Sequence, residues 1–149
     1  MPRGGTPQGN TTPVRIDDRS IAPDGVTDQD SRVTRDVTIE RAARWSDNPV
    51  AYSMEKYFDG YRADCSGYVS MAWNLSESRT TWTLVDVCGR QPIGKNDLRP
   101  GDVLIKNDVN DPQYGSHVVI FAGWADAERT AYRGYEQTPP QTRYNEAVP

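Results

Sequence analysis

Apolar and polar positions follow two different periods along this chain, which predicts helices in its first half and strands in its second. From Thr34 the apolar residues follow a partly helical spacing that stops near the breaker Asn48-Pro49. A second helical face follows, with apolar residues at i, i+3, i+4, i+7 and i+8, which are Cys65, Tyr68, Val69, Ala72 and Trp73. Asp64 precedes this face where an N-cap should be, so Cys65 falls in the first helical turn.

The second half of the chain has the short runs of β-branched residues that are typical of strands. A turn at residues 98–102 leads into a short buried strand at 103–105, and residues 116–122 have the strongest strand pattern in the chain. Further strands are expected at 130–137 and 142–148. Helices followed by an antiparallel sheet predict an α+β fold.

The first 32 residues differ in composition from the rest. The chain has four Trp, eight Tyr and two Phe residues, and all of them lie at or after Trp45. The N-terminal segment consists mainly of Gly, Pro, Thr, Asp and Arg, which bury too little apolar surface to offset the loss of chain entropy on folding. We therefore expect a flexible polar arm or linker at residues 1–32 and one folded domain at residues 33–149.

Charge and composition exclude several functional classes. The 21 acidic and 17 basic residues give a net charge of −4, with no basic run for nucleic acid, and no apolar run approaches the ~20 residues of a membrane span. The chain opens without the apolar segment of a signal peptide, so any export signal is expected outside this sequence, or export uses another route. The single histidine, His117, excludes sites that need several imidazoles, and we expect neither a metal nor an organic cofactor.

Two residues have the chemistry of a thiol hydrolase. A cysteine reacts as its thiolate, which the first turn of a helix favours, and an imidazole can accept and return the proton. Cys65 lies at a predicted helix start, and His117 lies at the start of a predicted strand 52 residues later. Cysteine before histidine, and helix before strand, is the order of papain-like hydrolases. Taken alone, the pair is better explained as a buried small side chain and a structural histidine.

Three motifs around these residues make the pattern specific. The chain reads DCSGYV at 64–69, LRPGDVL at 98–104 and HVVIF at 117–121. In this order the motifs closely resemble the NlpC family of papain-like cysteine peptidases, over roughly residues 36–137. The resemblance implies a papain-like fold whose nucleophile helix packs on a C-terminal antiparallel sheet. It also implies hydrolysis of amide bonds in bacterial peptidoglycan stem peptides, as in a DL-endopeptidase, through a thioester acyl-enzyme.

The resemblance also implies roles for individual residues. Cys65 would be the nucleophile, with its backbone N–H as one oxyanion donor, and His117 would be the general base that later serves as the acid. Tyr52 matches the family's tyrosine upstream of the cysteine and would help position the scissile carbonyl. Asp64 and Ser66 match positions that contact the free amine of a trimmed stem peptide. A role as helix cap alone explains Asp64 equally well.

A third residue should orient the imidazole from the strand that follows the histidine strand. Glu136 is our candidate, because a carboxylate on the neighbouring strand can accept the ring N–H. The long gap from His117 predicts an extended hairpin around residues 124–129. Gln137 would point to the opposite face of the sheet, and Asp126 is expected in the turn. An ordinary surface glutamate is nearly as good an explanation for Glu136.

The remaining candidates are less specific. Trp82, Tyr114 and Trp124 lie in predicted loops and are candidates for lining a substrate groove, although packing explains each of them at least as well. Cys88 lies outside every motif, and we expect it to be a spectator that forms no disulfide with Cys65.

The leading hypothesis is a secreted or cell-envelope peptidase, acting in wall remodelling or as a toxin or effector domain against another cell's wall. Its expected partner is the stem peptide, an inhibitor or immunity protein is a further candidate, and we expect a monomer. Two alternatives stay open: a papain-like amidase, deamidase or acyltransferase with another substrate, and a non-catalytic wall-binding module. The intact DCSG motif with an available His117 argues against the last.

Overall fold

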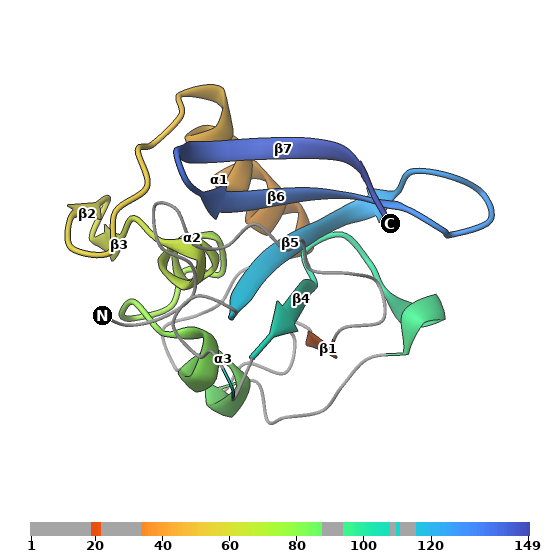
Figure 1. Cartoon of the computed structure of the whole chain (residues 1–149), viewed down its shortest axis with the longest axis horizontal. Coiled ribbons are helices and arrows are strands. Elements are labelled where there is room, and N and C mark those ends of the chain that lie inside the picture. The colour runs from red at the N-terminus through yellow and green to blue at the C-terminus, as the bar shows by residue number, and fades with distance from the viewer. Residues whose placement is uncertain (1–18, 22–33, 88–93, 108–109, 111–115) are drawn as a thin grey trace.

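The computed structural model describes residues 19–21, 34–87, 94–107, 110 and 116–149 (Figure 1). Its elements, in chain order, are β1 (Arg19–Ile21), α1 (Arg35–Asp47), β2 (Tyr57–Phe58), β3 (Tyr61–Arg62), α2 (Cys65–Ala72), α3 (Thr81–Val87), the 3-10 turn η2 (Lys95–Asp97), β4 (Val103–Lys106), β5 (His117–Trp124), β6 (Tyr132–Thr138) and β7 (Gln141–Val148).

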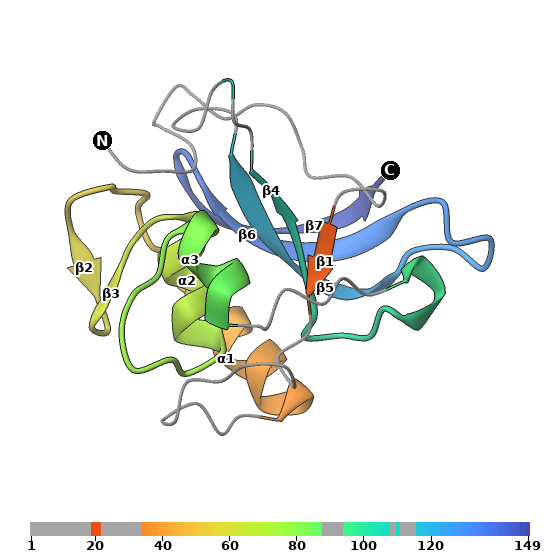
Figure 2. The ribbon, with the colours of Figure 1, turned by 90° about the horizontal axis from the view of Figure 1, so that it is seen from below.

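A five-stranded antiparallel sheet forms one layer of the molecule, and the helices gather on one side of it (Figures 1 and 2). The strand order is β1-β4-β5-β6-β7, and β2 and β3 form a separate two-stranded sheet. The fold is therefore α+β, as the change of period predicts. Within the part of the chain that the structure describes, no helix is long and apolar enough to cross a membrane.

The first helix begins and ends where the sequence predicts. The Thr34 hydroxyl accepts a hydrogen bond from the backbone N–H of Val37 at 3.2 Å, which is the geometry of an N-cap. At the other end, the helix stops at Asp47 and the N–H of Asn48 donates to the carbonyl of Arg44. The proline that follows accounts for this end, because it disfavours helical geometry in the residue before it.

The central helix α2 lies inside the core, and all eight of its residues are buried. The Tyr68 hydroxyl donates to the carbonyl of Ala42 on α1 at 2.6 Å, and the Tyr68 ring stacks on Trp45 with centroids 5.4 Å apart. Just past the helix, the Trp73 indole N–H donates to the carbonyl of Gly101, in the turn before β4. These contacts join α2 to α1 and to the turn that leads into β4, so the position of Cys65 is set by the core.

The turn before β4 holds a buried carboxylate that ties α1 to the sheet. Asp102 is fully buried, and its side chain accepts from the backbone N–H of Arg99 at 2.7 Å and from the Arg35 guanidinium at 2.5 Å. The carbonyl of Asp102 accepts from the N–H of Phe121 on β5. The PGD motif therefore has a structural explanation in these contacts.

Two strand features were not expected. Residues 19–21, within the predicted flexible arm, form β1 and pair antiparallel with β4, so the expectation of a flexible arm is wrong for them. Backbone hydrogen bonds alone can add an edge strand, and composition does not reveal them. Residues 1–18 and 22–33 lie outside the described part. The small β2–β3 sheet turns at Asp59-Gly60, whose positive φ angles of 54° and 87° fit a tight hairpin turn.

The tryptophans expected in loops lie in regular elements instead. Trp82 belongs to α3, where the Thr80 and Thr83 side chains exchange hydrogen bonds with each other's backbone N–H and start the helix. Trp124 is the last residue of β5 and packs against Phe121. The loop prediction was wrong for both, because reciprocal threonine caps and a longer strand were not recognised. Tyr114 and Cys88 lie outside the described residues.

The extended hairpin between β5 and β6 is confirmed. The connection spans residues 125–131, and Asp126 lies in it, accepting from the backbone N–H groups of Thr130 and Ala131 at 2.8 and 3.3 Å.

Replacing Gly67 by alanine should destabilise the domain strongly. A Cβ at Gly67 would lie 1.8 Å from the carbonyl oxygen of Arg62 and 2.9 Å from Asp64 Oδ1. Because the nearest atom is backbone, the helix entrance must shift, and we expect a loss of about 3 kcal/mol or more in the free energy of unfolding, measured by urea denaturation. Gly94→Ala is the control, since its Cβ meets only the end of the Asp97 side chain at 3.3 Å. Equal stability of the two variants would contradict this account.

Candidate active site

Cys65 is the first residue of α2, and Asp64 is the N-cap that places it there. Asp64 Oδ1 accepts from the backbone N–H of Gly67 at 2.8 Å, as the sequence predicts for a cap. Backbone N–H groups of the first helical turn have no acceptor within the helix, and they favour negative charge beside them. Cys65 forms no disulfide with a described residue and is fully buried. The sulfur therefore lies at the positive end of a helix, away from bulk water.

His117 is the first residue of β5, and Glu136 lies on the adjacent strand β6. Ile120 pairs with Tyr135 across these strands. Since side chains alternate along a strand, His117 and Glu136 both lie on the opposite face from that pair. His117 Nε2 and Glu136 Oε1 are 2.8 Å apart, and both residues are more than nine-tenths buried. The predicted contact between the carboxylate and the imidazole is confirmed.

The Cys65 thiol lies close to the same imidazole. The pKa of His117 is raised to about 9: burial lowers it, but hydrogen bonding to Cys65 and to Glu136, together with their charges, more than offsets the burial. With Nε2 directed at Glu136, Nδ1 is the ring nitrogen left for the thiol. Nδ1 is buried and has no other hydrogen-bond partner among the described residues.

Glu136 is held as a carboxylate by its surroundings. Burial raises its pKa, but the hydrogen bond and charge of His117, a hydrogen bond from Asn145 and the charge of Arg143 lower it to about 2. The imidazole and the carboxylate therefore form a buried ion pair over the whole range between these two pKa values. Such a pair favours an imidazolium next to the thiol, which is the arrangement that stabilises a thiolate.

Asp64 and Ser66, expected to contact a substrate amine, are both fully buried and turned toward the protein. Asp64 Oδ2 accepts from Arg62 Nε at 2.6 Å and Nη2 at 2.5 Å, while Oδ1 is bonded to Gly67 and lies 3.5 Å from the Ser66 hydroxyl. A carboxylate offers about four acceptor positions, and these contacts use them. The structure thus places Asp64 as a helix cap neutralised by Arg62.

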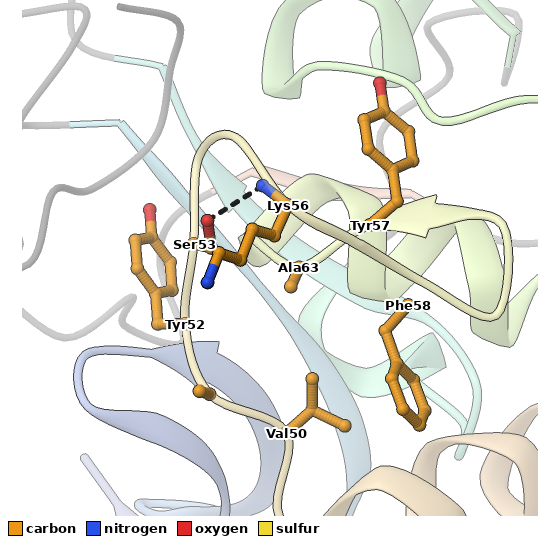
Figure 3. Close-up of a pocket in the computed structure, with 8 residues that line it drawn as sticks. Val50, Tyr52, Ser53, Lys56, Tyr57, Phe58 and Ala63 are labelled. Carbon is orange, nitrogen blue, oxygen red and sulfur yellow. Dashed lines mark hydrogen bonds between the residues drawn. The ribbon is translucent and has the colours of Figure 1, made fainter.

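Tyr52 lines a hollow of about 330 Å³ close to the start of α2 (Figure 3). Figure 3 shows Tyr52 and Phe58 on the two sides of the hollow, with Lys56 between them in this view. The wall also includes Ala63, two residues before Cys65. The full lining consists of Val50, Ala51, Tyr52, Ser53, Lys56, Tyr57, Phe58 and Ala63. A mostly apolar hollow of this size is large enough to hold a substrate side chain.

Gln137 supports this hollow and does not join the imidazole. Its side-chain amide donates to the carbonyls of Val50 and Ala63 at 3.0 and 3.2 Å, so it braces two walls of the hollow from β6. Strand alternation predicts that Gln137 lies on the face away from His117, and these contacts agree with that prediction.

Sequence reasoning missed the residues on β7 that touch Glu136. Asn145 Nδ2 donates to Glu136 Oε2 at 2.5 Å, and Arg143 Nε lies 3.3 Å from the same oxygen. Arg143 pairs directly with Glu136 across the two strands. Alternation along the predicted last strand puts residues 143 and 145 on one face, but only the strand register shows that this face meets Glu136.

Among the described residues, no group of three or more His, Cys, Asp or Glu side chains lies close enough together to hold a metal ion. Comparisons of the chain with protein-family models, with curated proteins and with solved structures found no match in any of the three.

The pKa of His117 can be measured directly, because it is the only histidine of the chain. A ¹H–¹³C NMR titration of the imidazole should show a pKa near 9 in the native protein. Glu136→Gln and Cys65→Ala should each lower it toward the ordinary value of about 6.5, since each removes a partner that raises it. A native pKa below 7 would contradict the described ion pair.

The same shift makes stability depend on pH. Because the folded pKa of His117 lies above its unfolded value of 6.5, its stabilising contribution is fully present below about pH 6.5 and is lost as pH rises through 9. The free energy of unfolding should therefore fall between these pH values in the native protein. The decrease should be smaller in Glu136→Gln.

Proposed function

We propose that this chain is a thiol hydrolase in which Cys65 is the nucleophile, His117 the general base and acid, and Glu136 the residue that orients the imidazole. The observation that carries the proposal is the buried 2.8 Å contact between His117 Nε2 and Glu136 Oε1, with the helix-terminal thiol beside the same ring. A nucleophile, a base and an orienting group in contact form the triad arrangement of acyl-transfer enzymes.

The chemistry follows from this arrangement. The Cys65 thiolate attacks the amide carbon, and the tetrahedral oxyanion is stabilised by backbone N–H groups at the start of α2, including that of Cys65. The imidazolium of His117 gives its proton to the leaving amine as the C–N bond breaks and a thioester forms. Water then gives a proton to His117 as it attacks the thioester carbon. The C–S bond breaks, which releases the acid and restores the Cys65 thiolate beside the His117 imidazolium. Glu136 keeps the ring oriented and stabilises its charged form throughout.

We further propose that the amide bond belongs to a stem peptide of bacterial peptidoglycan, cleaved in the cell envelope or after secretion. The DCSG, PGD and HVVIF motifs support this substrate class through their resemblance to the NlpC family. The hollow at Tyr52 supports it as well, because it lies beside the entrance of α2 and offers an apolar surface with one ammonium group, Lys56.

One observation favours the alternative in which another amide is the substrate. Asp64, which would anchor the free amine of a trimmed stem peptide, is fully buried and has its charge neutralised by the partly buried Arg62. A saturated carboxylate offers little attraction to an ammonium group. A papain-like amidase, deamidase or acyltransferase would need no such anchor.

Thiol labelling tests whether Cys65 is activated. In a Cys88→Ser background, where Cys65 is the sole thiol, iodoacetamide should react at about pH 7, well below the pH that an ordinary cysteine needs. His117→Ala should slow this reaction roughly tenfold or more, because the imidazolium that stabilises the thiolate is gone. Since Cys65 is buried, the rates of both proteins are also measured in denaturant, where they should be equal. A native rate unaffected by His117→Ala would favour a non-catalytic binding module.

Digestion of purified peptidoglycan, followed by mass spectrometry, tests the substrate. The native protein should release dipeptides or trimmed stem fragments, and Cys65→Ala should be inactive while retaining its fold. Glu136→Gln should lower turnover moderately and Glu136→Ala more strongly, because glutamine keeps an acceptor for the ring N–H. An unchanged digest with a reactive Cys65 would favour a different amide substrate.

The same assay with defined stem peptides tests the role of Asp64. If the carboxylate is committed to Arg62, peptides with a free and with an acetylated N-terminus should be cleaved at similar rates. A strong preference for the free amine would restore the role that the family resemblance implies.

A further inference from the structure

The two oxygens of Glu136 have different partners, and the second set of partners comes from β7. Oε1 faces His117, whereas Oε2 accepts from Asn145 Nδ2 at 2.5 Å and lies 3.3 Å from Arg143 Nε. The carboxylate is thus held between β5, which carries His117, and β7, which carries none of the three triad residues. Neither β7 residue belongs to any of the sequence motifs.

The strand register explains why these side chains converge. Arg143 lies directly opposite Glu136, and Asn145 lies opposite Gly134, two residues away on the same face. Gly134 has no side chain, so nothing from that position stands between Asn145 and the carboxylate. A Cβ there would lie 2.9 Å from the Tyr132 ring and 3.1 Å from the carbonyl of Ile120. The glycine therefore accommodates the Tyr132 ring, and the register alone puts Asn145 diagonal to Glu136 on the neighbouring strand.

The two β7 residues do not contribute equally. Asn145 is partly buried and makes a directed hydrogen bond, which fixes the rotation of the carboxylate about its own axis. The Arg143 side chain is about half exposed, so its attraction for Glu136 is weakened by solvent and salt. Asn145 is therefore the better candidate for setting orientation, and Arg143 adds favourable charge.

We propose that Asn145, assisted by Arg143, is a positioning residue that holds Glu136 in the orientation in which it supports His117. The inference rests on the proposed function, in which Glu136 orients the catalytic imidazole. A carboxylate anchored at only one oxygen can rotate away from the ring, whereas one anchored at both cannot do so without breaking a hydrogen bond. The consequence is a chain of contacts that runs from β7 through Glu136 and His117 to the nucleophile.

The primary test is the NMR titration of the single histidine, because it needs no substrate. Asn145→Ala should lower the pKa of His117 by about one unit, since the carboxylate that stabilises the imidazolium loses its anchor. Asn145→Asp, which has the same size but places a second negative charge against Glu136, tests the donor rather than the volume. Asn145→Asp should change the pKa of His117 by more than Asn145→Ala does. Arg143→Gln should have a smaller effect that diminishes as salt is added.

Two controls separate this role from a general structural one. Glu146→Gln changes a charge at an exposed position on the same strand and should leave the titration of His117 as in the native protein. In a Glu136→Gln background, Asn145→Ala should cause no further shift, because its effect passes through the carboxylate. An unchanged pKa in Asn145→Ala, or an equal shift in both backgrounds, would overturn the proposal.

Enzyme kinetics test whether the hydrogen bond from Asn145 to Glu136, the anchor of the carboxylate, matters for turnover. On stem peptides that the native protein cleaves, Asn145→Ala should lower kcat roughly tenfold, the loss expected for one hydrogen bond to a charged group, with KM nearly unchanged. If kcat is unchanged while the titration shifts, the contact does not hold Glu136 in an orientation that His117 needs for turnover, and the proposal is overturned. If no peptide is cleaved at all but the titration shifts as expected, the proposed function fails and the anchor stands.

Discussion

The buried carboxylate of Asp64 decides where α2 begins, and therefore where the sulfur of Cys65 lies. It caps the helix through the N–H of Gly67 and is paired with Arg62 on the preceding strand. Because Gly67 passes so close to the carbonyl of Arg62, only a residue without a side chain fits there. The cap, the ion pair and the glycine together make one rigid entrance to the helix. Most of the site is arranged around that entrance.

Two buried carboxylates lie near the candidate nucleophile, and they are used in opposite ways. Asp64 is saturated by Arg62 and by the helix, so its charge is satisfied within the fold. Glu136 gives one oxygen to His117 and the other to β7, so its charge bears on the imidazole. Burying either group unpaired would carry a large desolvation cost, and each is paired by a residue from a different element. Asp64 therefore serves the fold, whereas the charge of Glu136 is directed at the imidazole beside Cys65.

The candidate site combines a rigid framework with limited access. Cys65 is fully buried and His117 almost so, which strengthens their interaction with each other and with Glu136. The hollow at Tyr52 lies beside this framework and is lined by side chains of the chain segment that leads into α2. Gln137 braces that segment from β6, so the sheet supports both the imidazole and the wall of the hollow. The side chains that a substrate is proposed to contact are therefore held in position by the fold.

Sequence reasoning succeeded where the signal is local. The helix start at Thr34 and the cap at Asp64 are predicted from a polar side chain that precedes an apolar helical face, and both side chains cap their helices. The strand at His117 was predicted from its β-branched residues, and the face of Glu136 from simple alternation. The reasoning failed at residues 19–21 and at Trp82. An edge strand held by backbone hydrogen bonds, and a helix started by two threonines, leave little trace in hydrophobic pattern.

The amino-acid sequence by itself determined the class of fold, the start of α2 and the candidate pair Cys65 and His117, since capping, periodicity and the order of motifs are all properties of the linear chain. Only the tertiary structure decided which polar groups face each other. Arg62 takes up the charge of Asp64, and Asn145 reaches Glu136, because strand register and hairpin geometry bring them together. Such contacts depend on the packing of separate elements, which local patterns do not encode.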